Sequence, residues 1–258
     1  MGDTVNVTTD GPVVVITIDR QAVRNAVDGP TAAALADAFR AFDADPTVSV
    51  AVLTGAGGTF CSGADLGAIN SGGGNKILQD QSQDGPMGPT RMDLSKPVIA
   101  AVEGYAVAGG IELAAWCDLR VAATDAVFGV YCRRWGVPLV DGGTVRLPRL
   151  IGHSHAMDLI LTGRGVSGDE ARTMGLVNRL CETGTALATA VDLAQRMASF
   201  PQLCMRNDRR SAIGQWDTDM DAAMSTETEL GLESVRSDET ARAVARFVSG
   251  EGRHGAGV

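Results

Sequence analysis

The chain has 258 residues, of which 45% are hydrophobic and 21% are charged. This composition is close to the globular average, so it excludes global disorder and supplies enough apolar surface for a core. The formal net charge of -9 disfavours binding to nucleic acid or to an anionic membrane, because neither polyanion attracts an acidic surface.

The first elements along the chain are a strand, a helix and a second strand. Residues 13–19 are mostly β-branched and are bounded by turn residues, which favours a strand. Asp28 can cap the helix that follows, with Pro30 in its first turn and a stop near Asp45. Residues 48–54 then read as a buried strand, so the three elements predict a parallel unit with a right-handed crossover.

The middle of the chain repeats this unit after a polar insertion. Residues 67–95 are rich in Gly, Gln, Asp, Ser and Pro, so we expect a mobile surface segment that can gate a ligand site. The pattern predicts a strand over 97–102, a helix over 109–117 and another strand over 119–123. The sheet is therefore expected to span roughly residues 5–180.

The last third of the chain has a helical pattern. Residues 167–170 match a capping box before a short helix that ends near Gly175, and residues 186–198 predict a longer amphipathic helix. The remaining sequence alternates charged and apolar positions at helical spacing. We therefore predict a core over residues 1–195 and a helical C-terminal region over residues 196–258.

Two glycine-bearing turns follow neighbouring strands, with the sequences FCSGADL at residues 60–66 and GYAVAGGIE at residues 104–112. Ligands bind at the carboxyl ends of strands in open parallel sheets, so both turns can face one crevice. Gly109 begins a helix, where free N–H groups and the helix dipole suit a developing oxyanion, and Ala64 can supply a second donor. The alternative is that the glycines merely permit close helix–strand packing.

Glu112 is the best single candidate for a catalytic residue. It lies three residues after Gly109, within the otherwise apolar helical run 111–115. Desolvation in such a run raises the pKa of a carboxyl group, which suits proton transfer near neutral pH. The alternative is a glutamate that pairs with a basic neighbour for structural reasons.

Taken together, the two motifs resemble the oxyanion-hole segments of the enoyl-CoA hydratase/isomerase (crotonase) family. Other stretches agree: Arg24-Asn25-Ala26 resembles the first CoA-contacting turn of that family, residues 141–152 resemble its signature helix, and residues 163–177 resemble its LTG run. The resemblance covers nearly the whole chain. It implies an α/β fold, a spiral of ββα units with a helical C-terminal region, which assembles as homotrimers or as hexamers of two trimers.

The resemblance also implies the substrate, an acyl-CoA thioester, and the roles of individual residues. Ala64 and Gly109 would supply the N–H groups of the oxyanion hole, and Glu112 matches the acid/base glutamate of the hydratases. No metal and no redox cofactor are implied, because coenzyme A is part of the substrate. The substrate site is expected to include Arg24, Ala26, Ser62, Ala64, Asp65, Leu66, Tyr105 and Gly110.

One position departs from the family pattern. Hydratases of the family carry a second glutamate after the F-G that follows the third strand, and alignment on Phe128 places Cys132 there. A thiol with a pKa of about 8.5 is a poor substitute for a carboxylate. Hydration would therefore require Glu112 and another group to hold and activate the water together. Asp141 lies near the position where some isomerases of the family place an acid; it can compensate, or it can cap the next helix.

Three functions stay open on this sequence. Within the enzyme class, both hydration and Δ3-to-Δ2 isomerisation of an enoyl-CoA fit the motifs. The rival class is an acyl-CoA-binding homologue with little or no turnover, for which Cys132 is the chief argument. Arg133 and Arg134, which follow Cys132, either recognise an acidic acyl group or form exposed or interfacial ion pairs.

The cysteines and the amino-terminal segment bear on the compartment. Five cysteines are widely spaced and form no C-x-x-C pair, which argues against a disulfide framework and against a thiolate zinc site. Residues 1–10 lack the basic and apolar regions of a signal peptide, and no apolar run approaches the length of a membrane span. We therefore expect reduced thiols and a cytoplasmic protein.

Overall fold

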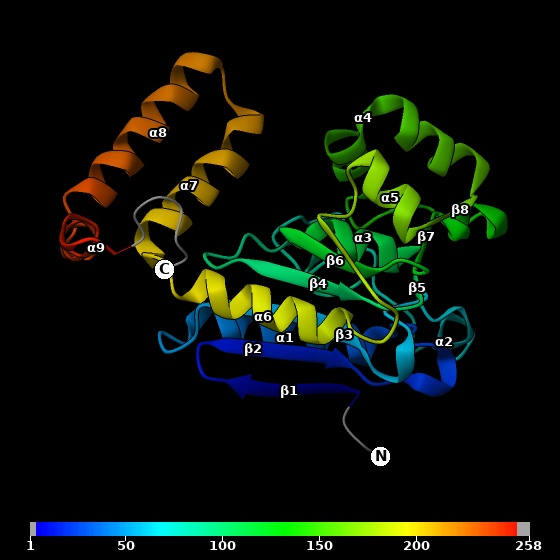
Figure 1. Ribbon diagram of the computed structural model, residues 1–258. Helices are drawn as coiled ribbons and strands as arrows, with labels where there is room; N and C mark the ends of the chain where they lie inside the picture. The colour runs from blue at the N-terminus through cyan, green and yellow to red at the C-terminus, as the bar shows by residue number, and fades with distance from the viewer. Residues whose placement is uncertain (1–3, 252–258) are drawn as a thin grey trace.

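The computed structural model describes residues 4–251, apart from the side chains of residues 69 and 70. Figure 1 shows a layered α/β core with a helical tail. The strands of the large sheet are β1 (Val5–Asp10), β2 (Val13–Ile18), β3 (Val50–Gly55), β4 (Val98–Val102), β6 (Leu119–Ala123) and β9 (Arg179–Cys181), in the order β1-β2-β3-β4-β6-β9. The strands of the small sheet are β5 (Tyr105–Val107), β7 (Val127–Gly129) and β8 (Gly165–Ser167), in the order β5-β7-β8.

The helices lie between and around these strands. The α-helices are α1 (Gly29–Ala44), α2 (Leu66–Asn70), α3 (Gly109–Trp116), α4 (Gly143–Thr162), α5 (Gly168–Met174), α6 (Ala186–Ala198), α7 (Gln202–Gly214), α8 (Met220–Val235) and α9 (Asp238–Ser249). Short 3-10 helices are η1 (Gln21–Val23), η2 (Ala56–Gly58), η3 (Pro89–Arg91), η4 (Tyr131–Trp135) and η5 (Gln215–Asp217). The predicted α/β class with a helical C-terminal region is confirmed.

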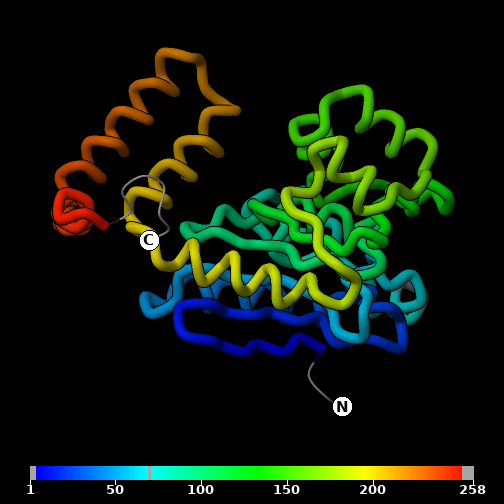
Figure 2. Tube along the Cα trace, viewed as in Figure 1, coloured from blue at the N-terminus to red at the C-terminus, as the bar shows by residue number. Residues whose placement is uncertain are grey.

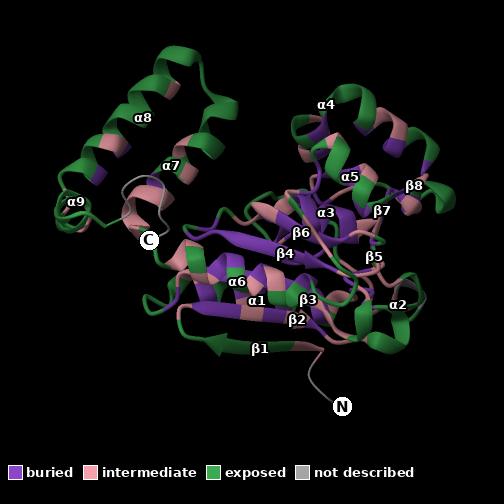
Figure 3. Cartoon of the chain, in the orientation of Figure 1, coloured by how far each residue is buried: buried purple, intermediate pink, exposed green. Residues whose placement is uncertain are grey.

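The large sheet is buried on both faces because helices cover each of them. Strands β2, β3, β4, β6 and β9 pair in parallel, and only β1 runs antiparallel to its neighbour β2. Helix α6 packs on one face through small and branched side chains such as Ala190 and Leu193. On the other face Leu35 and Phe39 of α1 join Ile111 of α3 in a larger core. Figure 3 shows the resulting burial of β3 and β4 and the exposure of β1.

Local sequence signals place several helix ends as predicted. The Asp28 carboxylate accepts a hydrogen bond from the Thr31 N–H at 2.9 Å and caps α1. The Ser167 hydroxyl accepts one from the Glu170 N–H at 3.2 Å and caps α5. These caps satisfy N–H groups that a helix leaves unpaired in its first turn.

The C-terminal helices project away from the sheet. Figure 1 and Figure 2 show α7 and α8 as a pair of neighbouring helices beyond the end of α6, with α9 at the far end of α8. The predicted boundary between residues 195 and 196 falls inside α6, which itself lies on the sheet. Within residues 4–251, the structure contains no helix long and apolar enough to cross a membrane.

The insertion after β3 differs from the prediction. We expected a surface segment over residues 67–95, but residues 85–90 are buried. Gly85 and Gly88 exchange two backbone hydrogen bonds of 2.9 and 2.8 Å, which close a tight turn. The prediction was wrong for this part because its burial depends on contacts with distant elements, which composition does not reveal.

Candidate active site

The two glycine-bearing turns lie side by side. The Cys61 N–H donates to the Tyr105 carbonyl oxygen at 2.8 Å, and the Val107 N–H donates to the Cys61 carbonyl oxygen at 3.1 Å. These bonds form a parallel bridge between the residues after β3 and strand β5. The prediction that both turns face one place at the end of their strands is therefore confirmed.

Glycines at the contact allow this close approach. A methyl group on Gly63 would lie 2.9 Å from the Gly109 nitrogen, and one on Gly110 would collide with the Cys61 carbonyl oxygen. Gly63 also has φ of +98°, which a residue with a side chain rarely adopts. The glycines therefore serve both roles at once. They allow close packing, and this packing sets Ala64 beside Gly109.

Two backbone N–H groups at the contact are unpaired. Within residues 4–251, neither the Ala64 nor the Gly109 N–H donates a hydrogen bond to the protein. Gly109 is the first residue of α3, where the helix dipole adds positive potential. The residue before it, Ala108, has φ of 54° and ψ of -124°, a strained conformation that costs about 1–3 kcal/mol.

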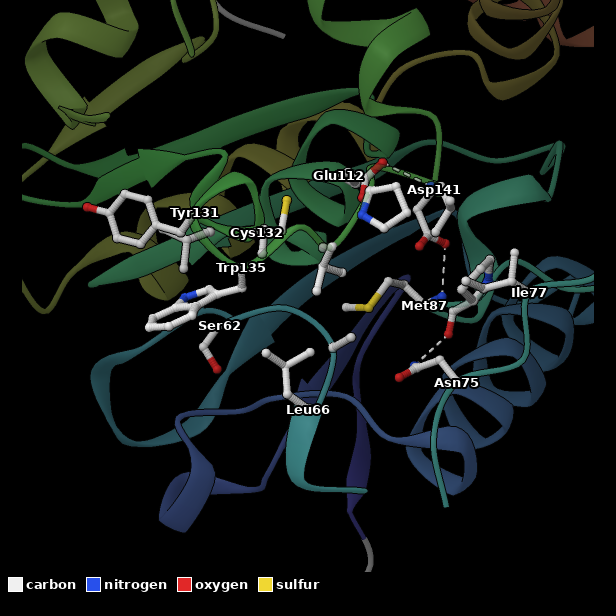
Figure 4. A pocket seen from close by; sticks show the side chains of 18 of the residues that line it. Ser62, Leu66, Asn75, Ile77, Met87, Glu112, Tyr131, Cys132, Trp135 and Asp141 are labelled. Carbon is white, nitrogen blue, oxygen red and sulfur yellow. Dashed lines mark hydrogen bonds between the residues drawn. The ribbon is translucent and has the colours of Figure 1, made fainter. Parts of the chain in front are cut away.

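Both N–H groups belong to residues that line a cavity of about 470 Å³. Figure 4 shows that its side chains converge from the two turns, from η4 and from the segments before β4 and before α4. A cavity of this size is typical of small-molecule sites. Eight of the predicted site residues line it: Arg24, Ser62, Ala64, Leu66, Tyr105, Gly109, Glu112 and Asp141.

The other three predicted residues do not line the cavity but support its wall. The Ala26 carbonyl oxygen accepts a hydrogen bond from the Arg20 guanidinium group, and Asp65 pairs with Arg20 at 3.0 Å. Gly110 packs against Cys61 behind the turn. Arg20 thus ties together the turn that contains Ala26 and the turn that contains Asp65.

Glu112 is held with one carboxylate oxygen in use. The residue is 2% exposed, and its Oε1 accepts hydrogen bonds from Asp141 N–H at 2.9 Å and Gly143 N–H at 2.8 Å, at the start of α4. Oε2 has no hydrogen-bond partner among the described residues. Burial raises the pKa of Glu112 to about 7, although the bond from Gly143 opposes this shift.

This arrangement decides between the two interpretations of Glu112. Within residues 4–251, no basic side chain forms an ion pair with it. The structural alternative, a pair with a basic neighbour, is therefore wrong for the described part of the chain. A buried carboxyl group that titrates near neutral pH and faces a cavity is suited to proton transfer.

Asp141 is also buried, at 4% exposure, but its carboxylate is directed elsewhere. Its Oδ1 accepts a hydrogen bond from the Met87 N–H at 2.9 Å and another from the Thr90 hydroxyl group. Burial raises its pKa, and the bond from Thr90 opposes the shift. The N-cap of α4 is Gly142, which has no side-chain bond, so the predicted capping role of Asp141 is wrong.

Cys132 lies on η4 and lines the cavity. It is 6% exposed. Burial raises the pKa of the thiol, and the charge of Glu112 raises it further. The group is therefore a neutral thiol near neutral pH, and it is a weak hydrogen-bonding group compared with a carboxylate.

The two arginines after Cys132 do not line the cavity. The Arg133 Nε donates to the Ile160 carbonyl oxygen at 3.1 Å, and the Arg134 guanidinium group donates to the Gly163 carbonyl oxygen at 2.9 Å. Both groups therefore bind at the C-terminal end of α4, where positive charge complements the helix dipole. Recognition of an acidic acyl group by these side chains is not supported.

Most of the apolar wall of the cavity lies outside the motifs that the sequence displays. Met87 is buried, at 1% exposure, whereas Trp135 is 74% exposed. The sequence contains one signal for Met87, because it is an apolar residue flanked by glycines and prolines within a polar insertion. The cavity-lining residues outside the sequence motifs are Asn75, Ile77, Pro86, Met87, Tyr131, Trp135, Val137, Pro138 and Val140.

Known proteins resemble this chain over most of its length. A family model described as enoyl-CoA hydratase/isomerase matches residues 8–251. The chain is 36% identical over 236 residues to enoyl-CoA hydratase EchA19 of Mycobacterium tuberculosis, covering 89% of this chain and 87% of the relative. It is 36% identical over 220 residues to crotonyl-CoA hydratase of Syntrophomonas wolfei, covering 83% of each.

The fold agrees with solved structures. A crystal structure of enoyl-CoA hydratase from Mycobacterium tuberculosis matches with a TM-score of 0.90 and 36% sequence identity, over 95% of this chain and 96% of that chain. The agreement extends through the helical C-terminal region. It confirms the fold that the motifs predicted.

Proposed function

This chain belongs to the enoyl-CoA hydratase/isomerase family, and on that premise we propose that it adds water reversibly to the double bond of a 2-enoyl-CoA thioester. The observation that carries the proposal is the buried carboxyl group of Glu112 in one cavity with two unpaired N–H groups. The names of the hydratase relatives support water addition as the reaction. Coenzyme A enters as part of the substrate, so we propose no separate cofactor.

The Ala64 and Gly109 N–H groups bind the thioester oxygen in this proposal. They stabilise the negative charge that develops there when the thioester becomes an enolate. Loss of one such donor costs about 3 kcal/mol of transition-state stabilisation in comparable sites. Because both donors are backbone groups held by tight packing, little reorganisation is needed as the charge develops.

Glu112 transfers the proton. In its carboxylate form, Oε2 accepts a proton from water while the water oxygen forms a bond to C3 of the substrate. The electron pair of the double bond moves onto the thioester oxygen, and Glu112 then returns the proton to C2. A pKa of about 7 suits both halves of this step, because both forms of the group are populated near neutral pH.

Isomerisation of a 3-enoyl-CoA is the second candidate, and Cys132 is the observation that favours it. Removal of a proton from C2 and its return to C4 requires one carboxyl group and no bound water. The raised pKa keeps the Cys132 thiol neutral, so it does not serve as a second base. Glu112, with a pKa of about 7, then acts as the acid/base group. The same enolate and the same two N–H groups serve this reaction.

The test is turnover of matched 2-enoyl-CoA and 3-enoyl-CoA thioesters by the wild-type protein and by Glu112→Gln. Loss of the conjugated chromophore with gain of one water indicates hydration, and its appearance from the 3-enoyl isomer indicates isomerisation. We expect hydration that Glu112→Gln abolishes. Tight acyl-CoA binding without turnover of any substrate would instead support the acyl-CoA-binding homologue.

Two further expectations stay predictions. The family resemblance implies a homotrimer or a hexamer of two trimers, and the chain's sequence led us to expect a cytoplasmic location. Size measurement and localisation of the tagged protein would test them directly.

A further inference from the structure

Residues 85–88, here called the 85–88 turn, form a buried wall of the cavity. The turn is closed by two backbone hydrogen bonds between Gly85 and Gly88. A methyl group on Gly85 would collide with the Thr90 hydroxyl oxygen, and one on Gly88 would collide with the Ala32 carbonyl oxygen of α1. The turn is therefore packed closely on both sides.

Asp141 fixes the 85–88 turn to the start of α4. Its Oδ1 accepts the hydrogen bond from the Met87 N–H at 2.9 Å and the one from the Thr90 hydroxyl group. Arg146 reinforces the link, because its guanidinium group donates to the carbonyl oxygens of Asp141 and Thr90, each at 2.8 Å. All the protein contacts of the Asp141 carboxylate that the structure describes thus serve to hold this wall.

The turn places the Met87 side chain beside the reacting atoms. A methyl group on Gly109 would come within 2.7 Å of the Met87 sulfur, so the thioether packs directly on the residue that offers its N–H group. Figure 4 shows Met87 between Glu112 and Leu66 in the middle of the cavity. A thioester whose oxygen accepts from the Gly109 N–H would therefore lie next to the Met87 thioether, in the cavity that Glu112 also lines.

We propose that Asp141 is a positioning residue which acts through Met87, and that Met87 restricts the acyl group to short, unbranched, apolar chains. This inference rests on the proposed function. It separates the roles of the two buried carboxyl groups: Glu112 moves the proton, and Asp141 holds the wall that the acyl chain meets. The neighbouring wall is apolar, with Ile77, Pro138 and Val140 in it.

The first test compares acyl selectivity in Met87 variants. We would measure kcat/KM for straight four-carbon, straight ten-carbon and C3-branched 2-enoyl-CoA thioesters. Met87→Ala removes the thioether, so the ratio of ten-carbon or branched to four-carbon kcat/KM should rise by about tenfold or more. Met87→Leu, a control of similar volume, should leave the ratio within about threefold.

The second test separates positioning from proton transfer at Asp141. Asp141→Asn keeps an oxygen acceptor for the Met87 and Thr90 donors, so the chain-length ratio and the shape of the pH profile should stay near those of the wild type. Asp141→Ala removes the acceptor and should shift the ratio in the same direction as Met87→Ala. Loss of activity towards every substrate in Asp141→Asn, with an unchanged ratio, would show that Asp141 is a proton donor.

Failure of the inference is distinct from failure of the proposed function. If the folded wild-type protein turns over no thioester, the hydratase proposal fails, and the dissociation constants of saturated four-carbon and ten-carbon acyl-CoA then test the selectivity. If turnover occurs but Met87→Ala keeps the wild-type chain-length ratio, with an unchanged circular dichroism spectrum, the inference about Met87 and Asp141 is overturned.

Discussion

The carboxyl group of Glu112 combines a structural contact with a group free for chemistry. Its Oε1 accepts two backbone N–H groups at the start of α4, while Oε2 has no described protein partner. Burial in the helix α3 raises the pKa of the group to about 7. Burial at this position therefore destabilises the ionised form of the carboxyl group relative to the protonated form.

This shift predicts a pH-dependent effect of Glu112→Gln on stability. The folded-state pKa is about 7 and the ordinary value is 4.5, so the folded protein binds the proton more tightly than the unfolded chain. As pH rises from 4.5 to 7, the free energy of unfolding of the wild type falls by about 3 kcal/mol, because Glu112 must ionise. Glu112→Gln does not show this fall, because glutamine is uncharged. In urea unfolding, the free energy of unfolding of Glu112→Gln relative to the wild type should be more favourable at pH 8 than at pH 5. An equal difference at both values would contradict the raised pKa.

Cys132 is expected to be dispensable for proton transfer. The thiol is buried and neutral, so Cys132→Ala should lower kcat by far less than the factor of about 100 or more that loss of a proton-transfer group costs. Steady-state kinetics on the best enoyl-CoA substrate checks this, with Glu112→Gln as the positive control for a lost acid/base group. A comparable loss in both variants would assign the thiol a direct role.

Sequence reasoning reached Glu112 but not the role of Asp141. The placement of Glu112 follows from helical spacing after Gly109, a local relation that the sequence displays. The partner of Asp141 is Met87, 54 residues away, and such a contact leaves no local pattern. The capping role that local pattern suggested for Asp141 is consequently the part that was wrong.

At the scale of elements, the strand–helix–strand units were predictable because period, caps and turn residues are local signals. The turns at residues 60–66 and 104–112 follow strands as predicted, and their contact is made by hydrogen bonds between Cys61 and strand β5. The 85–88 turn was not predictable in the same way. Its burial requires α1 on one side and the start of α4 on the other.

The contact between the two turns predicts the effect of Gly110→Ala. The added methyl group collides with the Cys61 carbonyl oxygen, so α3 and the 60–66 turn must separate and the two N–H donors must move apart. We expect kcat to fall by a factor of about 100 or more while the protein remains folded. Gly231→Ala in α8 is the matched control, because a methyl group there meets nothing within 4 Å. Its activity should stay unchanged and its stability should rise by up to about 1 kcal/mol.

For the molecule as a whole, the helical tail leaves several large apolar side chains exposed. Helices α7 and α8 project away from the sheet (Figure 1, Figure 3). Extended apolar surfaces on globular proteins commonly mark sites of contact with a partner. The exposed apolar residues on α7, α8 and α9 include Ile213, Met220, Met224, Val235 and Val244.

This surface and the family resemblance together predict self-association. Light scattering after gel filtration should give a mass three or six times that of the chain. Met224→Asp, which places a charge on the exposed side of α8, should lower that mass, whereas Gly231→Ala should not. A monomeric wild-type protein at micromolar concentration would contradict the predicted assembly.

The most direct test of the proposed enolate chemistry is exchange of the C2 protons of a saturated acyl-CoA with solvent deuterium. Exchange requires removal of a C2 proton and stabilisation of the enolate, so it isolates Glu112 and the two N–H groups from the choice between hydration and isomerisation. We expect exchange with the wild-type protein and its loss in Glu112→Gln. Equal exchange in both proteins, or no exchange in a wild-type protein that binds the thioester, would contradict it.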